Sequence, residues 1–333
     1  MKYEEIAPRF KELLENSQKI VVMQADNPDG DSLASALALE SILEEAGKNV
    51  YLYCAIDMPD YLKHLSGWDR VNKEFPSNFD LAIIVDTGVW KLFGNFENKY
   101  GRYKLPPEKL MVIDEHDTEH SIEATLDAHD TKAVSSGQII YELAKAANLK
   151  ISKLSAEFIA SSILSDTLGL NSSTLANNHR PFHIMGELVE IGVDVSELNE
   201  RRQERLKISP DILHYKGELI QRIEYFANNR IASITIPYDE LREHSQELNP
   251  TIVLDEARMV DGVAVTIGFK QYVSQGRMVR ITGRIRCNRG YEIADKIAGL
   301  FEDGGGHTYA SGFKVEGDNL DFNGIKTKVL QYT

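Results

Sequence analysis

The stretch VVMQADNPDGDSLASALAL, residues 21–39, runs from an apolar segment of strand character through a tight turn into a segment of helical character. The turn carries carboxylates at Asp26, Asp29 and Asp31. Asn, Pro and Gly are ordinary turn formers and Asp is a good helix N-cap, so this turn alone is compatible with a structural role. A chemical role requires other strands that also end in acids.

Apolar runs of strand length recur through the first half of the chain and alternate with helical patterns. After the first strand they are NVYLYCAI (49–56), DLAIIVDTG (80–88) and KLMVIDEH (109–116). Near-continuous apolar strands separated by helices are typical of a parallel sheet that is covered on both faces. We therefore expect an α/β fold with a doubly wound parallel sheet in the N-terminal domain.

The pattern of apolar and polar residues changes twice beyond residue 136. Apolar residues at three- and four-residue spacing predict helices at 136–149, 155–170 and 180–192, and a charged helical stretch at 195–229. Alternating β-rich runs follow at 230–238, 262–273 and 277–287, then a helix at 291–302 and the glycine-rich DGGGHTYASGF at 303–313. We expect an N-terminal domain at 1–195, a helical connector at 196–220 and a smaller α+β C-terminal domain at 221–333.

Composition and charge exclude several classes of protein. The 333 residues, 42% apolar and 26% charged, suit two globular domains. A formal charge of -14 argues against wrapping long duplex DNA, which needs many cationic phosphate contacts, but it leaves a small phosphate ligand open. Residues 1–19 lack the features of a secretory signal, and no apolar run approaches membrane-spanning length. We therefore expect no membrane partner. Because the chain has only two cysteines, Cys54 and Cys287, which are far apart, we also expect no disulfide framework, no thiolate zinc site and a reducing cytoplasmic location.

Carboxylates end three of the apolar strands. Asp86 ends LAIIVDTG and Asp114 ends LMVIDEH, in addition to the turn with Asp29 and Asp31, while Asp166 follows an apolar helix in SILSDTLGL. Ligands of open α/β sheets bind outside the carboxyl ends of the strands. Convergent carboxylates repel one another unless a cation lies between them. Oxygen and imidazole ligands without thiolates suit Mg²⁺ or Mn²⁺, and Zn²⁺ is also compatible.

These motifs resemble those of the DHH phosphoesterase family, which includes RecJ-type nucleases, nanoRNases, cyclic-dinucleotide phosphodiesterases and family II pyrophosphatases. The family's first to fourth motifs have counterparts in this chain at NPDGDSLAS (27–35), VDTG (85–88), DEH (114–116) and SDT (165–167), in that order. Residues 173–199 are similar to the stretch that follows the fourth motif in bacterial nanoRNase-like members. GGGHTYASGF (304–313) resembles the glycine-rich signature of the DHH-associated C-terminal domain. The resemblance covers most of the chain, and its motifs occur in the family's order.

The resemblance implies a catalytic N-terminal domain with two divalent metal ions, Mn²⁺ or Mg²⁺, and a substrate-binding C-terminal domain. The metal ligands that it implies are Asp29, Asp31, Asp86, Glu115 and Asp166, with Asp86 placed to bridge the two ions. Asp114 would orient its neighbours, His116 would approach the substrate phosphate or leaving group, and His307 would complete the catalytic set. The implied substrate contacts are Arg284, Arg286, Gly304, Gly305, Gly306 and His307, and Arg180 is a further phosphate-contact candidate.

Two positions depart from the family pattern. Ala25 stands where the family has a histidine before the motif proline, and Glu115 replaces the central histidine of the third motif. Both missing imidazoles are metal ligands in the family. Glu115 can still coordinate through its carboxylate, whereas Ala25 cannot, so one metal must lose a ligand, take water or recruit Asp26 or Gln24. We expect a preference shifted toward Mg²⁺ or one weakened site.

The resemblance predicts a metal-dependent phosphoesterase that hydrolyses short single-stranded oligonucleotides or small nucleotides, including 3′-phosphoadenosine 5′-phosphate and linear or cyclic dinucleotides. The glycine-rich C-terminal signature argues against a pyrophosphatase, and the short chain argues against a processive RecJ-like nuclease. The alternative is a catalytically impaired nucleotide-binding or regulatory protein on the same fold, which Ala25 and Glu115 favour. Family members are often dimeric, which leaves a homodimer open.

Several of these residues have a plain structural interpretation. Gly304, Gly305 and Gly306 follow a predicted helix and could serve as its C-cap and turn. The arginines could lie on the solvent face of an alternating strand. The remaining histidines are expected to be surface or packing residues: His120, His129, His179 and His183.

Overall fold

The structure, a computed structural model, describes residues 1–205, 207–243, 251–306 and 308–332. The chain divides into two units, Met1–Lys207 and Ile208–Thr333. This division falls inside the predicted connector, because α7 (Val195–Arg205) belongs to the first unit and α8 (Pro210–Gln221) to the second. None of the helices in the described part of the chain combines the length and the apolar character that crossing a bilayer requires.

The first unit is an α/β domain built on a parallel sheet. Its strands are β1 (Lys19–Met23), β2 (Asn49–Tyr53), β3 (Leu81–Val85), β4 (Leu110–Asp114) and β5 (Leu126–His129). Its α-helices are α1 (Tyr3–Glu15), α2 (Gly30–Glu45), α3 (Gly94–Tyr100), α4 (Ser136–Ala146), α5 (Lys153–Asp166), α6 (Arg180–Ile191) and α7. Single 3-10 turns occur at Asp60–Leu62, Trp68–Arg70, Trp90–Leu92, Arg102–Lys104, Pro107–Lys109 and Ser173–Leu175. The five strands are all parallel, in the order β2-β1-β3-β4-β5, which confirms the predicted fold class.

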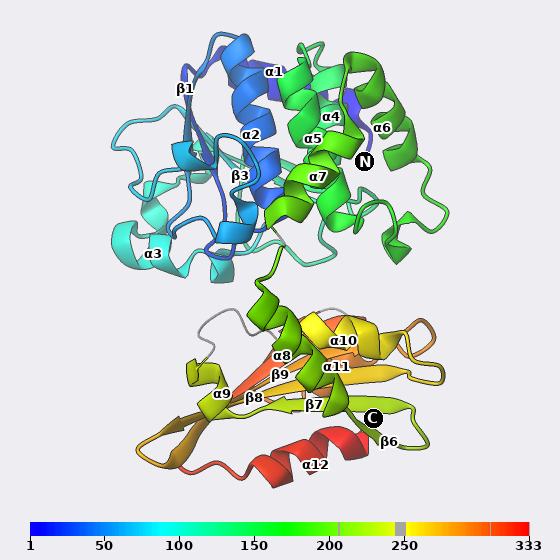
Figure 1. The fold of residues 1–333 in the computed structure, drawn as a ribbon. Helices are drawn as coiled ribbons and strands as arrows, with labels where there is room; N and C mark the ends of the chain where they lie inside the picture. Colours follow the sequence, from blue (N-terminus) through cyan, green and yellow to red (C-terminus); the bar gives the residue numbers. More distant parts are fainter. Residues whose placement is uncertain (206, 244–250, 307, 333) are drawn as a thin grey trace. The chain divides into compact units, whose positions relative to one another are not determined.

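Both faces of this sheet are buried, as the apolar strand pattern predicts. Along β1, Ile20 and Val22 pack into a core with α1, α2, α4, α5 and α6, whereas Val21 and Met23 pack into a second core with α3 and nearby aromatic side chains. Every residue of β3 and β4 is buried. Helices therefore lie on both sides of the sheet (Figure 1).

The strand order brings the predicted acidic segments to one edge. In a parallel sheet all carboxyl ends face the same way, and β1, β3 and β4 are direct neighbours. The connections reverse direction between β1 and β3, because β2 lies on the far side of β1. Such a switch point opens a crevice beyond the strand ends. The turn before α2, Asp86 after β3 and the Asp114 segment after β4 all reach this edge.

The glycine of the PDGD turn has a steric reason. A Cβ on Gly30 would lie 2.3 Å from the Ser165 Oγ, so only glycine lets the first turn of α2 approach the last turn of α5 this closely. Asp29 caps α2 in a reciprocal arrangement with Ser32. The close approach places the start of α2 beside Asp166, the last residue of α5.

The second unit is α+β, as predicted, with a six-stranded mixed sheet ordered β10-β11-β9-β8-β7-β6. Its strands are β6 (Glu224–Phe226), β7 (Ile231–Ile236), β8 (Val265–Ser274), β9 (Arg277–Cys287), β10 (Asp303–Gly306) and β11 (Ala310–Glu316). Its helices are α8, α9 (Tyr238–Glu243), α10 (Thr251–Arg258), α11 (Ala294–Ala298) and α12 (Phe322–Tyr332). One sheet face packs against α11 and α12, and α8 packs on the opposite face at β7.

Two local expectations were wrong, one alternative is excluded, and the strand β5 was missed. The helical stretch predicted to reach residue 229 ends at Gln221, and β6 follows it. The helix predicted at 291–302 is only the short α11. The glycine run is the edge strand β10 paired with β11, not a free turn. The strand β5 was not predicted, because LDAH is short and only half buried.

Candidate metal centre

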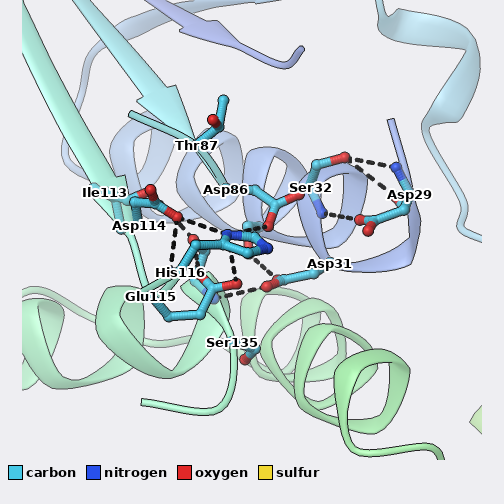
Figure 2. Close-up of polar contacts among 12 residues, drawn as sticks. Asp29, Asp31, Ser32, Asp86, Thr87, Ile113, Asp114, Glu115, His116 and Ser135 are labelled. Atoms are coloured by element: carbon cyan, nitrogen blue, oxygen red, sulfur yellow. Dashed lines mark hydrogen bonds and ion pairs between the residues drawn. The ribbon is translucent and has the colours of Figure 1, made fainter. Parts of the chain in front are cut away.

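Three carboxylates from distant parts of the chain converge at the carboxyl edge of the first sheet. Asp31, Glu115 and Asp166 each offer one oxygen, and these three atoms lie within 4.8 Å of one another. They come from the first turn of α2, the loop after β4 and the end of α5. Asp86, Glu115 and His116 form a second such group that shares Glu115. Figure 2 shows Asp31, Asp86 and Glu115 pointing into the same space.

Asp31 is fully buried and its carboxylate is held at both oxygens. The hydroxyls of Ser35 and Ser162 donate to Oδ1 at 2.7 and 2.6 Å, and the Ser136 backbone N–H donates to Oδ2 at 2.7 Å. Three hydrogen bonds from three helices fix the orientation of the carboxylate. One of its oxygens also lies within 4.8 Å of an oxygen of Glu115 and an oxygen of Asp166.

Two neighbouring oxygens are buried without any hydrogen bond. The Ser136 hydroxyl donates to Glu115 Oε2 at 2.7 Å, but among the described residues no donor reaches Glu115 Oε1 or Asp86 Oδ1. The imidazole of His116 lies close to both, with its Nδ1 3.4 Å from Glu115 Oε1 and 3.9 Å from Asp86 Oδ1. A buried carboxylate oxygen without a partner is costly, and a cation would satisfy both oxygens.

Asp86 adopts a conformation that is uncommon outside glycine. Its φ is 68°, in the left-handed region, and its N–H donates to the Ile113 carbonyl at 2.9 Å. Such a conformation costs about 1 kcal/mol or more for a residue with a Cβ and is found where a side chain must be aimed. It turns the Asp86 carboxylate toward the acids at the edge of the sheet.

Burial and mutual repulsion raise the pKa values of the clustered acids. Burial, then the charge of Asp31, raises the pKa of Glu115 to about 8. Burial, then the charges of Asp31 and Asp29, raises the pKa of Asp166 to about 10. The pKa of Asp86 is raised well above its ordinary value by burial and by the same neighbours. Without a cation these acids would have to hold protons at neutral pH, so a hard divalent ion such as Mg²⁺ or Mn²⁺ fits the donor set.

Asp29 and the residues around Ala25 are placed differently. Asp29 is exposed and caps α2, accepting the Ser32 N–H at 3.0 Å, and its charge contributes to the raised pKa values of the cluster. Ala25 is buried in the core on the α3 side. Asp26 accepts the Asn95 N–H at 2.7 Å and Gln24 accepts from the Ser32 hydroxyl at 3.5 Å. Neither expected substitute belongs to the groups of converging ligand atoms among the described residues.

Asp114 and His116 form a hydrogen-bonded pair beside the clustered acids (Figure 2). Asp114 is fully buried, and its Oδ1 lies 2.8 Å from His116 Nδ1 and accepts the His116 N–H at 3.1 Å. The hydrogen bond with Asp114 raises the pKa of His116 to about 9. Burial alone would raise the pKa of Asp114, but the hydrogen bonds from His116 outweigh it and the pKa is lowered. The His116 side chain is 36% exposed, so this imidazole reaches solvent.

The comparisons with known proteins identify this domain. Residues 19–163 match the model of the DHH family, N-terminal domain. The first unit contains a DHH-family N-terminal domain, and we call this unit the DHH domain. The bifunctional oligoribonuclease and PAP phosphatase NrnA of Thermus thermophilus is 24% identical to the chain over 300 residues, which are 89% of this chain and 83% of that protein.

Two solved structures share the fold. An exopolyphosphatase-related protein from Bacteroides fragilis aligns with a TM-score of 0.84 at 20% identity, covering 99% of this chain and 96% of that one. RecJ from Thermus thermophilus, in complex with Mn²⁺, aligns with a TM-score of 0.53 at 17% identity, covering 99% of this chain and 54% of RecJ. Both likenesses extend over the DHH domain and the second unit.

Sequence reasoning missed the polar residues that hold the DHH acids. Ser136 and Ser162 support Asp31, and the signal for the first was the Ser-Ser pair that opens α4. His120 and His129 were expected to be surface or packing residues. Instead, the His120 side chain is 8% exposed and its Nε2 lies 2.8 Å from Asp114 Oδ2, while His129 Nε2 lies 2.6 Å from the His116 carbonyl. No spacing rule in the sequence pointed to these contacts.

The candidates in the second unit lie on one face of its sheet. Arg286 is paired across the sheet with Thr266 and Ala310, and Arg284 with Gly268 and Gly312. Burial lowers the pKa of Arg286, the charge of Asp255 opposes this shift, and the charges of Arg284 and Arg258 add to it. Crowded cations of this kind favour an anionic ligand.

The glycine run and its histidine complete the list of candidates in this unit. A Cβ on Gly304 would lie 1.8 Å from the Ala298 carbonyl oxygen, so this glycine is required by packing against α11. A Cβ on Gly305 would meet nothing within 4 Å, and Gly306 has a φ of 133°. His307 lies outside the described residues.

Arg180 is placed in an ion-pair network of the DHH domain. Its guanidinium donates to Asp130 Oδ2 at 2.9 Å and to Glu142 Oε1 at 2.7 Å, and it contacts the Tyr3 hydroxyl. These acids raise its pKa further above the ordinary value, although burial opposes the shift. Asp130 is 2% exposed, so Arg180 balances a buried carboxylate. The structure does not bring Arg180 into the converging groups of acids.

Proposed function

We propose that this protein is a divalent-metal-dependent phosphodiesterase that acts on short single-stranded oligonucleotides or small nucleotides. A DHH phosphoesterase domain makes the chain a hydrolase of phosphodiester bonds. The observation that carries the proposal is the group of Asp31, Glu115 and Asp166, of which the first two are buried. Beside it lie buried oxygens of Glu115 and Asp86 that no donor reaches within the part of the chain that the structure describes. The relative NrnA, named as an oligoribonuclease and PAP phosphatase, supports the substrate class.

The donor set supports one strong metal position and one weaker one. Asp31, Glu115 and Asp166 would hold the first ion, and the second would lie beside Asp86 and Glu115. The resemblance adds Asp29 to the ligands of the second ion, but Asp29 belongs to neither group of converging atoms among the described residues, and Ala25 offers no ligand. A pair of divalent ions supplies an activated water and charge stabilisation at the attacking and leaving oxygens.

Titration of the metal-free protein with Mn²⁺ tests this assignment, read by calorimetry and by elemental analysis. We expect one tight and one weak ion in the natural chain, and a tighter second ion in Ala25→His. Two equally tight ions in the natural chain would contradict the weak second position.

The residues of the chain supply positioning and a proton. His116 has a raised pKa of about 9, so its imidazole is protonated at neutral pH and Asp114 holds the proton on Nδ1. A cationic imidazole that reaches solvent beside the acids suits contact with a phosphate oxygen or donation to a leaving oxygen. Arg284 and Arg286 are the proposed phosphate contacts of the second unit.

A substrate panel tests the activity directly. Purified protein is incubated with ribodinucleotides, 3′-phosphoadenosine 5′-phosphate, cyclic dinucleotides or pyrophosphate, each with Mg²⁺ or Mn²⁺. We expect turnover of the first two substrates, abolished by chelation and by Asp166→Asn. No turnover of any substrate under these conditions would remove the proposal.

A non-catalytic nucleotide-binding protein is the second candidate, and the replacements at Ala25 and Glu115 favour it. Tight binding of a dinucleotide that is unaffected by chelator and not followed by hydrolysis would support this candidate. The cytoplasmic location and the homodimer stay predictions from the sequence, and size-exclusion chromatography with light scattering tests the second.

A further inference from the structure

The side chain of His120 is 8% exposed and lies between the carboxylates of Asp114 and Asp127. Together with Asp114 and His129 it forms a third group of converging ligand atoms, which shares no residue with the group of Asp31, Glu115 and Asp166. The Nε2 of His120 lies 2.8 Å from Asp114 Oδ2 and its Nδ1 lies 3.0 Å from Asp127 Oδ2. Both ring nitrogens of His120 therefore lie within hydrogen-bond distance of a carboxylate oxygen. Among the described residues, His120 is the hydrogen-bond partner of that second Asp114 oxygen.

The ring of His120 occupies a slot that a glycine of the second motif creates. A Cβ on Gly88 would lie 2.2 Å from the Cγ of His120. The segment that carries His120 is also hydrogen-bonded to this glycine: the Ser121 and Ile122 N–H groups donate to the Gly88 carbonyl at 2.9 and 3.0 Å. The Trp90 N–H donates to the Ser121 hydroxyl at 2.9 Å. The segment after Asp86 and the segment after Asp114 are therefore joined at His120.

A second histidine completes the arrangement. The rings of His120 and His129 stack with centroids 4.0 Å apart and an interplanar angle of 29°. His129 Nε2 lies 2.6 Å from the carbonyl oxygen of His116. One stacked pair thus fixes both the backbone of His116 and, through Asp114, its ring nitrogen.

We propose that His120 is a positioning residue for the phosphodiester hydrolysis proposed above, acting through Asp114 to orient the imidazole of His116. Asp114 uses one oxygen for each histidine, at 2.8 Å in both cases. When the bond to His120 is lost, the Asp114 carboxylate can rotate about its Cβ–Cγ bond and the His116 ring loses its fixed acceptor. Asp127 holds the far nitrogen of His120 and thereby limits rotation of the ring.

The expected effect is a loss in turnover rather than in binding. Removing a hydrogen-bonded supporting residue of an active-site group typically lowers activity by about 10- to 100-fold. We expect His120→Asn to lower kcat by this factor, to leave KM within about twofold and to leave Mn²⁺ affinity unchanged, because its contacts reach none of the clustered carboxylates. His183→Ala is the matched control, since His183 pairs with Glu187 on the surface of α6.

A double-mutant cycle distinguishes positioning from a general structural role. If His120 acts through His116, then His120→Asn causes no further loss of kcat in a His116→Ala background. An undiminished loss in that background, or an unchanged kcat in the single variant, would overturn the proposal. Gly88→Ala, which closes the slot without altering any histidine, should reproduce the kcat loss of His120→Asn.

A readout that does not depend on turnover separates this inference from the proposed function. In long-range ¹H–¹⁵N spectra of the natural protein we expect His116 Nδ1 to carry a proton protected by Asp114, and we expect His120→Asn to remove that protection. Retained protection would refute the inference even in an active enzyme, whereas absence of turnover in the natural protein refutes only the proposed function. Metal binding that requires His120 and His129 but survives Asp31→Asn would also overturn it, because the rings would then be ligands.

Discussion

Replacing Glu115 by glutamine should stabilise the metal-free protein, although Glu115 lies at the centre of the candidate site. The folded pKa of about 8 lies above the ordinary value of 4.5. Between these values the folded protein holds a proton that the unfolded chain has released. The contribution of the Glu115 carboxyl to the free energy of unfolding is therefore fully present below pH 4.5 and is lost as the pH rises toward 8.

The magnitude follows from the two pKa values. Linkage gives a cost of about 4 kcal/mol at pH 8 and about 1 kcal/mol at pH 5.5 for keeping this carboxyl in the folded protein. Glu115→Gln removes the titrating group, and the amide oxygen can still accept the bond from the Ser136 hydroxyl. In chelator, we expect the variant to exceed the natural chain in unfolding free energy by these amounts.

Urea unfolding followed by circular dichroism at pH 5.5 and pH 8 measures the difference. Glu119→Gln, at an exposed site in the same loop, is the control and should behave as the natural chain does. With saturating Mn²⁺ the order should reverse, because a ligand bound only by the folded state stabilises it and Glu115→Gln weakens that binding. A variant no more stable than the natural chain in chelator at pH 8 would refute the argument that the clustered acids repel one another.

Two further predictions concern residues to which the structure gives packing or ion-pair contacts and no place among the clustered acids. Gly304→Ala should lose about 1–3 kcal/mol of stability, because its Cβ would meet the Ala298 carbonyl, whereas Gly305→Ala should be nearly neutral; equal losses in urea unfolding would contradict the packing argument. Arg180→Met should destabilise the protein by about 3 kcal/mol, with KM unchanged, because the buried Asp130 would keep only the more distant N-terminal ammonium, at 3.4 Å, of its two described cationic partners. A raised KM at unchanged stability would instead support the phosphate contact that the sequence suggested for Arg180.

The first sheet was predictable because burial on both faces leaves a local signature. β3 and β4 are buried at every position, so their sequences are continuous apolar runs. The short strands carried no such signature. β5 has exposed and half-buried positions, and β6 has no fully buried residue, so their pairing with β4 and β7 defines them more than their composition does.

The glycine run shows how one local pattern can serve a different purpose. Three successive glycines after a helix are compatible with a cap, a turn or an anion site. The structure pairs them with β11 and presses Gly304 against the carbonyl of Ala298. The contact that requires glycine comes from α11, and the composition of the run does not reveal it.

The sequence by itself determined that acids would gather at one edge, because the carboxyl ends of parallel strands share an edge and the acids directly follow those strands. It also contained the replacements at Ala25 and Glu115. Only the tertiary structure decided which acids face one another, which oxygens lack a donor and that His120 reaches Asp114. Those contacts depend on distances between segments that are remote along the chain, such as α2, α4 and α5 around Asp31, and no periodicity within one segment encodes them.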